Sequence, residues 1–177
     1  MKSKVISISA ISAGLIAILL TIGAYFEITD LITTVFASCL VLLPLYYNSY
    51  KGAILTYLVG GVIAFMFSGF NLYTLVFPSY FLFGGIYPII STFLRERKNK
   101  KLLVYIVGAI YACALFIGLY YYYVFFMKVP VSDLPKIVQD NIVLVMAIIG
   151  VVFFFVFDRF IMLVRRVSSY YLNKIIK

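Results

Sequence analysis

Long apolar stretches separated by short polar breaks run through the whole chain. A helix needs about 20 mainly apolar residues to cross a membrane, and six stretches meet that length. They cover residues 5–26, 31–50, 52–69, 73–94, 102–126 and 141–164. The breaks carry charges or turn-forming residues, such as Lys51-Gly52 and Ser68-Gly69. The pattern predicts an all-α fold, a bundle of six transmembrane helices in a single membrane domain over residues 1–177.

Three features interrupt or extend this pattern. Pro44 lies inside the second stretch and predicts a kink there, or the end of its regular part. The longest polar break is 128–140, in which residues 132–138 can form a short interfacial helix capped by Ser132. After the last stretch, residues 168–177 set apolar Tyr171, Leu172, Ile175 and Ile176 against Lys174 and Lys177, which predicts a short amphipathic tail helix at the membrane surface.

The charged residues give the six stretches an orientation. Residues 95–101 hold five of the chain's 15 basic side chains, so they form a loop outside the lipid. With that loop in the cytoplasm, 13 basic residues fall inside and two, Lys128 and Lys136, fall outside. Cytoplasmic loops of membrane proteins are enriched in Lys and Arg. We therefore expect both termini in the cytoplasm.

Composition narrows the class of protein. Hydrophobic residues make up 65% of the chain, against about 45–50% in soluble domains. The net charge of +9 comes from loops and tails, where it faces anionic lipid headgroups, and no basic face with base-stacking aromatics lies outside the apolar stretches. The first stretch is too long for a signal peptide and has no small-x-small cleavage site after it. We expect a multi-pass protein of the cell membrane that binds no nucleic acid.

Few residues can carry catalysis. The chain has no His, which excludes a Ser-His pair and a His-ligated zinc ion. Cys39 and Cys113 lie within apolar stretches and lack the spacing and companions of a metal site or a disulfide. The sequence thus predicts no enzyme, metal or cofactor, although an enzyme acting on membrane lipids remains a third class of function.

Asp158 is the ionisable residue nearest to bilayer depth. It lies beside Arg159 and before Arg165, which favours an ion pair near the cytoplasmic helix ends. The alternative is a role in coupling or gating, because carboxylates within membrane spans often serve these functions.

Polar and tyrosine side chains gather at the predicted outer side. Such groups at helix ends can frame a pocket with apolar walls and a few oriented polar groups. We predict a ligand pocket that opens outward and takes a flat molecule that is mostly uncharged or weakly charged. Its residues are Glu27, Asp30, Asn71, Tyr73, Tyr111, Tyr122 and Asn141. The alternative is that they are ordinary wet loop ends with an interfacial tyrosine belt.

Small residues recur every four positions in the first stretch, at Ser9, Ala13 and Ala17. Four-residue steps place them on one helix face, where another helix can approach closely. This stripe predicts a docking surface for a separate membrane partner; packing inside the six-helix bundle is the alternative. Gly108 and Ala112 form a second, weaker patch.

The pattern resembles the substrate-binding S components of energy-coupling-factor (ECF) vitamin transporters. The resemblance covers the whole chain in size and number of spans. Its specific residues are Ala13-x-x-x-Ala17, which is similar to that family's docking motif, and the segment from Gly84-Gly85 to Arg95. It implies a substrate-capturing subunit whose first three helices dock on a transmembrane coupling subunit, with ATPase subunits supplying the energy. Its last three helices and outer loops would enclose the ligand.

The chain also resembles the rod-shape-determining MreD proteins in size and helical layout. Phe67-Ser68-Gly69 with the following Gly84-Gly85 is similar to their third-to-fourth span region, although Met66 stands where those proteins usually carry Asp. This resemblance implies a non-enzymatic scaffold of the cell-elongation machinery.

Overall fold

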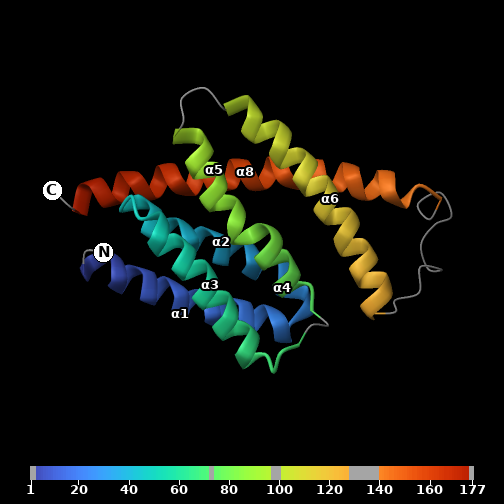
Figure 1. The fold of residues 1–177 in the computed structure, drawn as a ribbon, viewed down its shortest axis with the longest axis horizontal. Coiled ribbons are helices and arrows are strands. Elements are labelled where there is room, and N and C mark those ends of the chain that lie inside the picture. The colour runs from blue at the N-terminus through green and yellow to red at the C-terminus, as the bar shows by residue number, and fades with distance from the viewer. Residues whose placement is uncertain (1–2, 72–73, 97–100, 128–139, 176–177) are drawn as a thin grey trace. The chain divides into compact units, whose positions relative to one another are not determined.

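The computed structural model describes residues 3–71, 74–96, 101–127 and 140–175, and every regular element in these ranges is helical. Figure 1 shows the helices α1 (Ser3–Tyr25), α2 (Asp30–Tyr46), α3 (Tyr50–Phe67), α4 (Val76–Ser79), α5 (Ile86–Glu96), α6 (Lys101–Met127) and α8 (Ile142–Ile175). A 3-10 turn, Glu27–Thr29, precedes α2, and a π-helical segment, Tyr80–Gly84, joins α4 to α5. The predicted all-helical fold is confirmed.

Five helices are long and apolar enough to cross a membrane. They are Ser3–Tyr25, Tyr50–Phe67, the α4–α5 run Val76–Glu96, Val104–Phe125 within α6 and Ile142–Ser168 within α8. The predicted second span is the shorter apolar helix Asp30–Tyr46, of 17 residues. At a rise of about 1.5 Å per residue it is about 26 Å long, just under the hydrocarbon thickness of about 30 Å. These helices have the length and composition of a multi-pass membrane protein.

Some predicted boundaries are wrong. Helix α2 continues through Pro44 and ends at Tyr46, two residues later, because Asn48 takes a positive φ of 53° that no helix interior accepts. Helix α8 does not stop at residue 164: it runs unbroken to Ile175, so the predicted tail is the continuation of the last span. The predicted helix 132–138 lies outside the described residues.

The helices form two compact units, each described here by itself. Unit 1 comprises residues 1–93 and 159–177, and unit 2 comprises residues 94–158. Helix α8 contributes its second half to unit 1 and its first half to unit 2. The single domain over residues 1–177 stays a prediction.

Helices α1, α2 and α3 form the core of unit 1 and lie side by side (Figure 1). Residue numbers increase in the same direction along the contacts between α1 and α3. The hydroxyl of Thr56 donates to the carbonyl of Ser9 at 3.2 Å, and further along both helices Gly60 contacts Ile16. The two helices are therefore parallel. A Cβ added at Gly60 would lie 2.8 Å from Ile16 and 3.0 Å from the carbonyl oxygen of Ala13, so this close approach requires glycine.

The π-helical segment of unit 1 is tied to α3 by two tyrosines. A π turn shifts the backbone pairing, and here the N–H of Gly85 bonds the carbonyl of Tyr80 at 2.8 Å. The hydroxyl of Tyr57 donates to the carbonyl of Phe81 at 2.9 Å, and the hydroxyl of Tyr80 donates to the carbonyl of Tyr57 at 3.3 Å. Gly85 leaves room for the Tyr57 ring, which a Cβ would strike. The irregular backbone thus keeps its hydrogen bonds inside the bundle, as apolar surroundings demand.

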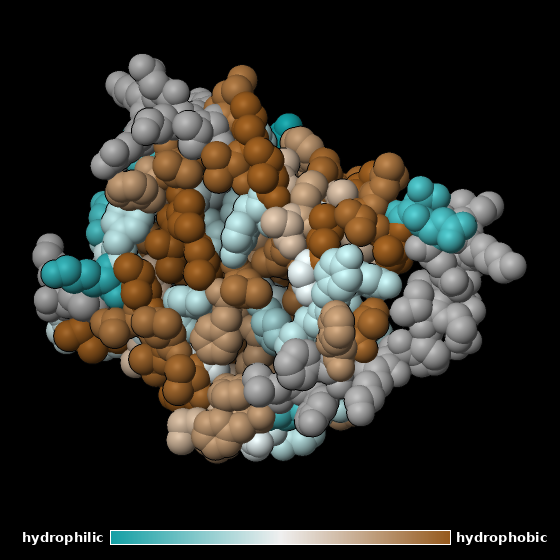
Figure 2. All heavy atoms as spheres, turned by 45° about the vertical axis from the view of Figure 1, so that its right-hand side comes forward, coloured by the Kyte–Doolittle hydropathy of each residue, from teal (hydrophilic) through white to brown (hydrophobic). Residues whose placement is uncertain are grey.

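Helix α6 and the first half of α8 pack antiparallel in unit 2. Gly108 lies under the ring of Phe154, and further along α6 the thiol of Cys113 donates to the carbonyl of Ala147 at 3.4 Å. At their closest approach, a Cβ added at Gly150 would lie 2.9 Å from the carbonyl oxygen of Ala112. The outer faces of both helices stay apolar and exposed. Brown, apolar side chains cover much of the described surface in Figure 2, as expected where lipid replaces water.

Candidate functional site

A buried ion pair is the most distinctive polar feature of unit 2. Asp158 on α8 is 1% exposed, and the guanidinium of Arg95, at the end of α5, reaches both carboxylate oxygens. The Nη2 atom of Arg95 lies 2.7 Å from Oδ1 and 2.8 Å from Oδ2 of Asp158. Charge-assisted bonds of this length are among the strongest side-chain hydrogen bonds. The predicted ion pair at Asp158 exists, and its partner Arg95 lies 63 residues earlier, on another helix.

An aromatic ring completes the cluster. The Cζ atom of Arg95 lies 5.1 Å from the centroid of the Tyr105 ring, on α6, within cation–π range. Tyr105 stacks on Phe155, which lies one turn before Asp158 on α8. The guanidinium therefore has a carboxylate as its ion-pair partner and a ring at cation–π distance, and it joins residues of three helices. We refer to Arg95, Tyr105 and Asp158 as the ion-pair cluster.

The ion-pair cluster can hold the end of α5 in position against α6 and α8. Asp158 is nearly inaccessible, whereas Arg95 is partly buried, with 15% of its side chain exposed. Two buried charges offset each other's desolvation only when their geometry is good, and removal of one leaves the other uncompensated. Among the described residues, no group of three or more His, Cys, Asp and Glu side chains comes together in a way that could hold a metal ion.

Sequence reasoning missed Arg95 and Tyr105. A usable signal was present, because the predicted topology brings the end of the fourth span and the end of the last span to the same cytoplasmic side. Arg95 and Asp158 then lie at similar membrane depth, and a carboxylate at that depth needs a cation.

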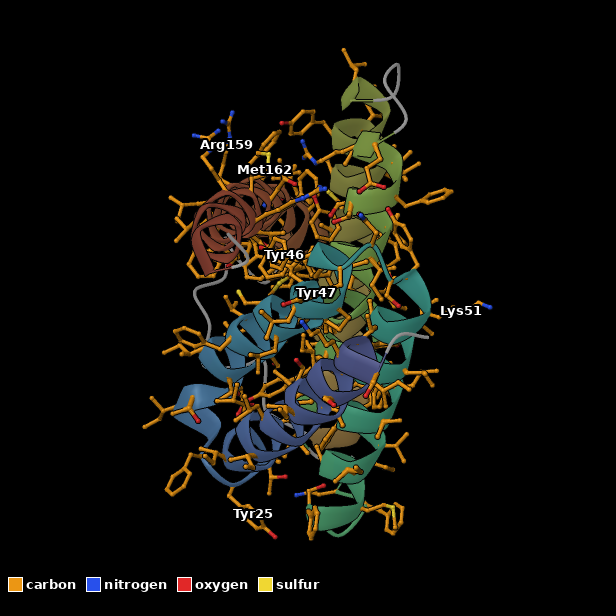
Figure 3. The ribbon with its side chains drawn as sticks, turned by 90° about the vertical axis from the view of Figure 1, so that its left-hand side faces the viewer. Tyr25, Tyr46, Tyr47, Lys51, Arg159 and Met162 are labelled. Atoms are coloured by element: carbon orange, nitrogen blue, oxygen red, sulfur yellow. The ribbon has the colours of Figure 1, made fainter. Side chains whose placement is uncertain are left out.

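Part of the predicted outer polar group gathers at one end of unit 1. The hydroxyl of Tyr25, at the end of α1, donates to the carbonyl of Phe67, at the end of α3, at 3.3 Å. Asp30 begins α2 a few residues after Tyr25, and Asn71 follows α3. Figure 3 shows Tyr25 at the end opposite Tyr46 and Tyr47. Asp30 and Asn71 thus share one end of the unit, whereas the Glu27 side chain and Tyr73 lie outside the described residues.

The other predicted pocket residues belong to unit 2. Because α6 and α8 are antiparallel, Tyr122 near the end of α6 and Asn141 just before α8 lie at the same end of the pair. Tyr111 lies near the middle of α6 and is 40% exposed. The pocket as a whole stays a prediction, since its residues divide between the two units.

The small-residue stripe of α1 is covered by the chain itself. Ser9, Ala13 and Ala17 are 7%, 4% and 5% exposed, and the first two contact α3 around Thr56 and Gly60. This is the internal-packing alternative of the sequence analysis. In unit 1 the stripe joins α1 to its neighbours, and docking of a separate partner stays a prediction. In the second patch, Gly108 and Ala112 are likewise occupied, by Phe154 and Gly150.

Comparison of the chain with protein-family models, with curated proteins and with solved structures finds no match in any of the three. Functional inference therefore depends on the geometry described above.

Proposed function

We propose that the chain is the substrate-capturing membrane subunit of an uptake transporter, similar to the S components of ECF transporters. It would bind a small molecule from the outer side and depend on a transmembrane coupling subunit and ATPase subunits for energy. Helices of spanning length and composition support a membrane location. Nearly all described residues belong to these helices.

The observation that carries the proposal is that the two ends of unit 1 differ in their charged and polar residues. Asp30 and Asn71 lie at one end, whereas Lys4 and Lys51 begin the parallel helices α1 and α3 at the other. Basic residues favour the cytoplasmic face. The end with Asp30 and Asn71 would therefore face outward, and the termini would lie in the cytoplasm of a cell-membrane protein. An outward polar end between apolar helices is a suitable entrance for a small ligand.

A scaffold in the cell-elongation machinery, similar to MreD, is the second candidate. The burial of Ser9, Ala13 and Ala17 favours it, because the transporter resemblance assigns docking to those positions. The segment Phe67-Ser68-Gly69 supports it too: α3 ends at Phe67, and Gly69 turns the chain with φ +68°. A scaffold needs partners but no ligand pocket.

Native mass spectrometry of the gently purified protein separates the two candidates. A transporter subunit should carry a bound small molecule or retain coupling and ATPase subunits. Co-purification of cell-wall synthesis proteins without a ligand would support the scaffold and contradict the transporter. Asp30→Asn and Asn71→Ala should weaken ligand binding, and Ser7→Ala, on the exposed face of α1, is the matched control.

Tags added at both termini should be accessible only from the cytoplasm; a terminus found outside would overturn the orientation.

A further inference from the structure

The basic end of unit 1 contains a second polar cluster, distinct from the predicted pocket. The hydroxyl of Tyr46, at the end of α2, donates to the carbonyl of Val164 at 3.2 Å. The same tyrosine is within side-chain hydrogen-bonding reach of Ser168 and close to the charge of Arg165. Tyr46, Arg165 and Ser168 therefore bring one guanidinium and two hydroxyl groups together, and we refer to them as the Tyr46 cluster.

The geometry of α8 explains why these groups meet. Arg165 and Ser168 are three residues apart, so they share one face of the helix. At 100° per residue, Arg159 lies nine residues and about 180° away from Ser168. Figure 3 agrees with this calculation, since Arg159 projects from the side of α8 that faces away from Tyr46.

The length of α8 places this cluster near a membrane surface. Its 34 residues extend about 51 Å, whereas the hydrocarbon core is about 30 Å thick. About 20 residues from Ile142 reach across, so Arg165 and Ser168 lie beyond the hydrocarbon, at headgroup level. Tyr46 and Tyr47 lie at the same end of unit 1, as tyrosines of an interfacial belt do (Figure 3).

The charge at this end of unit 1 has one sign. Lys4 and Lys51 lie in the first turns of α1 and α3 there, and Arg159, Arg165 and Arg166 lie along the second half of α8. Asp30, the one carboxylate that the structure describes in this unit, lies at the opposite end. An anion is therefore the complementary ligand, and at headgroup level the abundant anion is the phosphate of an acidic phospholipid.

We propose that the Tyr46 cluster is a binding site for the headgroup of an anionic phospholipid. The guanidinium of Arg165 pairs with the phosphate, and the hydroxyl of Ser168 donates to it. The hydroxyl of Tyr46 keeps its proton on the carbonyl of Val164 and braces the second half of α8 against α2. The bound lipid would stabilise this end of unit 1. The site is independent of the proposed function and holds for a transporter subunit or a scaffold alike.

The test is a lipid titration of the full chain in neutral detergent micelles, followed by thermal unfolding and native mass spectrometry. Phosphatidylglycerol should bind and raise the unfolding midpoint, whereas phosphatidylcholine with the same acyl chains should not. Arg165→Gln should weaken phosphatidylglycerol binding roughly five- to tenfold. Arg159→Gln is the matched control: it removes the same charge from a different face of the same helix, about 120° from Arg165, and should change the affinity less than twofold.

Three outcomes would overturn the proposal. If both variants lose the same affinity, the lipid senses overall charge and the Tyr46 cluster is no site. If Arg165→Gln unfolds the chain without added lipid, the milder variant Ser168→Ala replaces it in the test. Ser168→Ala should then reduce phosphatidylglycerol binding, and unchanged binding in that variant contradicts the site. If inorganic phosphate stabilises the chain as well as phosphatidylglycerol does, the ligand is a free anion and the lipid assignment is wrong.

Discussion

The helices inside unit 1 and the helices inside unit 2 are held together by different kinds of contact. In unit 1, three helices approach closely through small residues, and hydroxyl groups donate to backbone carbonyls, as between Thr56 and Ser9. In unit 2, two helices meet over glycines, and one ion pair is buried at the end of the pair. Lipid supplies no hydrophobic drive between helices, so each unit depends on contacts of close packing or on polar groups. Cohesion in unit 1 is spread over many small contacts, whereas in unit 2 it is concentrated at a few positions.

The largest expected effect comes from Asp158→Ala. It leaves the guanidinium of Arg95 buried without its carboxylate, and we expect unit 2 to lose about 3–5 kcal/mol of stability. Thermal unfolding in detergent micelles measures the loss. Arg159→Ala, at the exposed neighbour, is the control and should have little effect. An equal loss in both variants would mean that the pairing of Asp158 contributes nothing specific. The double variant Arg95→Met, Asp158→Leu should recover much of the stability.

Ala13→Trp should rank second. Its side chain would have to fit beside Gly60, where α1 and α3 nearly touch, and over-packing of this kind costs roughly 3 kcal/mol. Unfolding of the isolated chain should occur at a lower temperature, with no partner required. Ile11→Trp, on the exposed face of α1, is the control. A stable Ala13→Trp variant that has lost a co-purifying membrane partner would instead restore the docking hypothesis.

Gly150→Ala tests whether unit 2 depends on its closest backbone approach. The new Cβ would lie 2.9 Å from the carbonyl oxygen of Ala112, and backbone cannot yield as a side chain does. We expect a loss of about 1–2 kcal/mol. Gly118→Ala is the control: that glycine lies on the partner helix α6, has open space around it and should gain up to about 1 kcal/mol of helix propensity. Stability changes of the same sign in the two variants would contradict the packing argument.

Tyr57→Phe should have the smallest effect of the four. It removes the donor to the carbonyl of Phe81 in the π-helical segment, and one such hydrogen bond contributes about 0.5–1.5 kcal/mol. Hydrogen exchange should increase in residues 80–85 more than in the rest of unit 1. Tyr25→Phe, at the exposed end of α1, is a control that also loses one bond to a carbonyl. Unchanged exchange in residues 80–85 would show that the π-helical segment does not need Tyr57.

The helices themselves were predictable because each apolar stretch carries its own signal in composition. Ala13 shows the limit of that signal, since a small residue on a helix face favours close approach without saying whether the neighbour is α3 or another protein. The end of α8 was missed for a related reason. Arg165 and Arg166 were taken as the end of the last span, but a helix can continue into water or along a surface with no break in its backbone.

The ion-pair cluster shows what a local pattern leaves out. Asp158 was recognised as unusual from its own apolar surroundings, and the nearest arginines in sequence were taken as its partners. In a helix, Arg159 points to a different face from Asp158, so proximity in sequence does not make a pair. Arg95 comes from another helix, and its pairing with Asp158 can be predicted only from knowledge of which helices pack together. The predicted pocket residues depend on the same knowledge, and their convergence stays a prediction for that reason.

The separation of 63 residues between Arg95 and Asp158 also sets an order of events during synthesis. At about 5–20 residues per second, Arg95 leaves the ribosome roughly 3–13 s before its partner. Its long side chain can keep the guanidinium among the headgroups during that interval. The short carboxylate of Asp158 has no such reach, and its helix pays about 2.5–3.5 kcal/mol to enter lipid alone. We therefore expect Arg95 to lower this cost when α8 inserts, and so to receive the last helix before it becomes part of the folded structure.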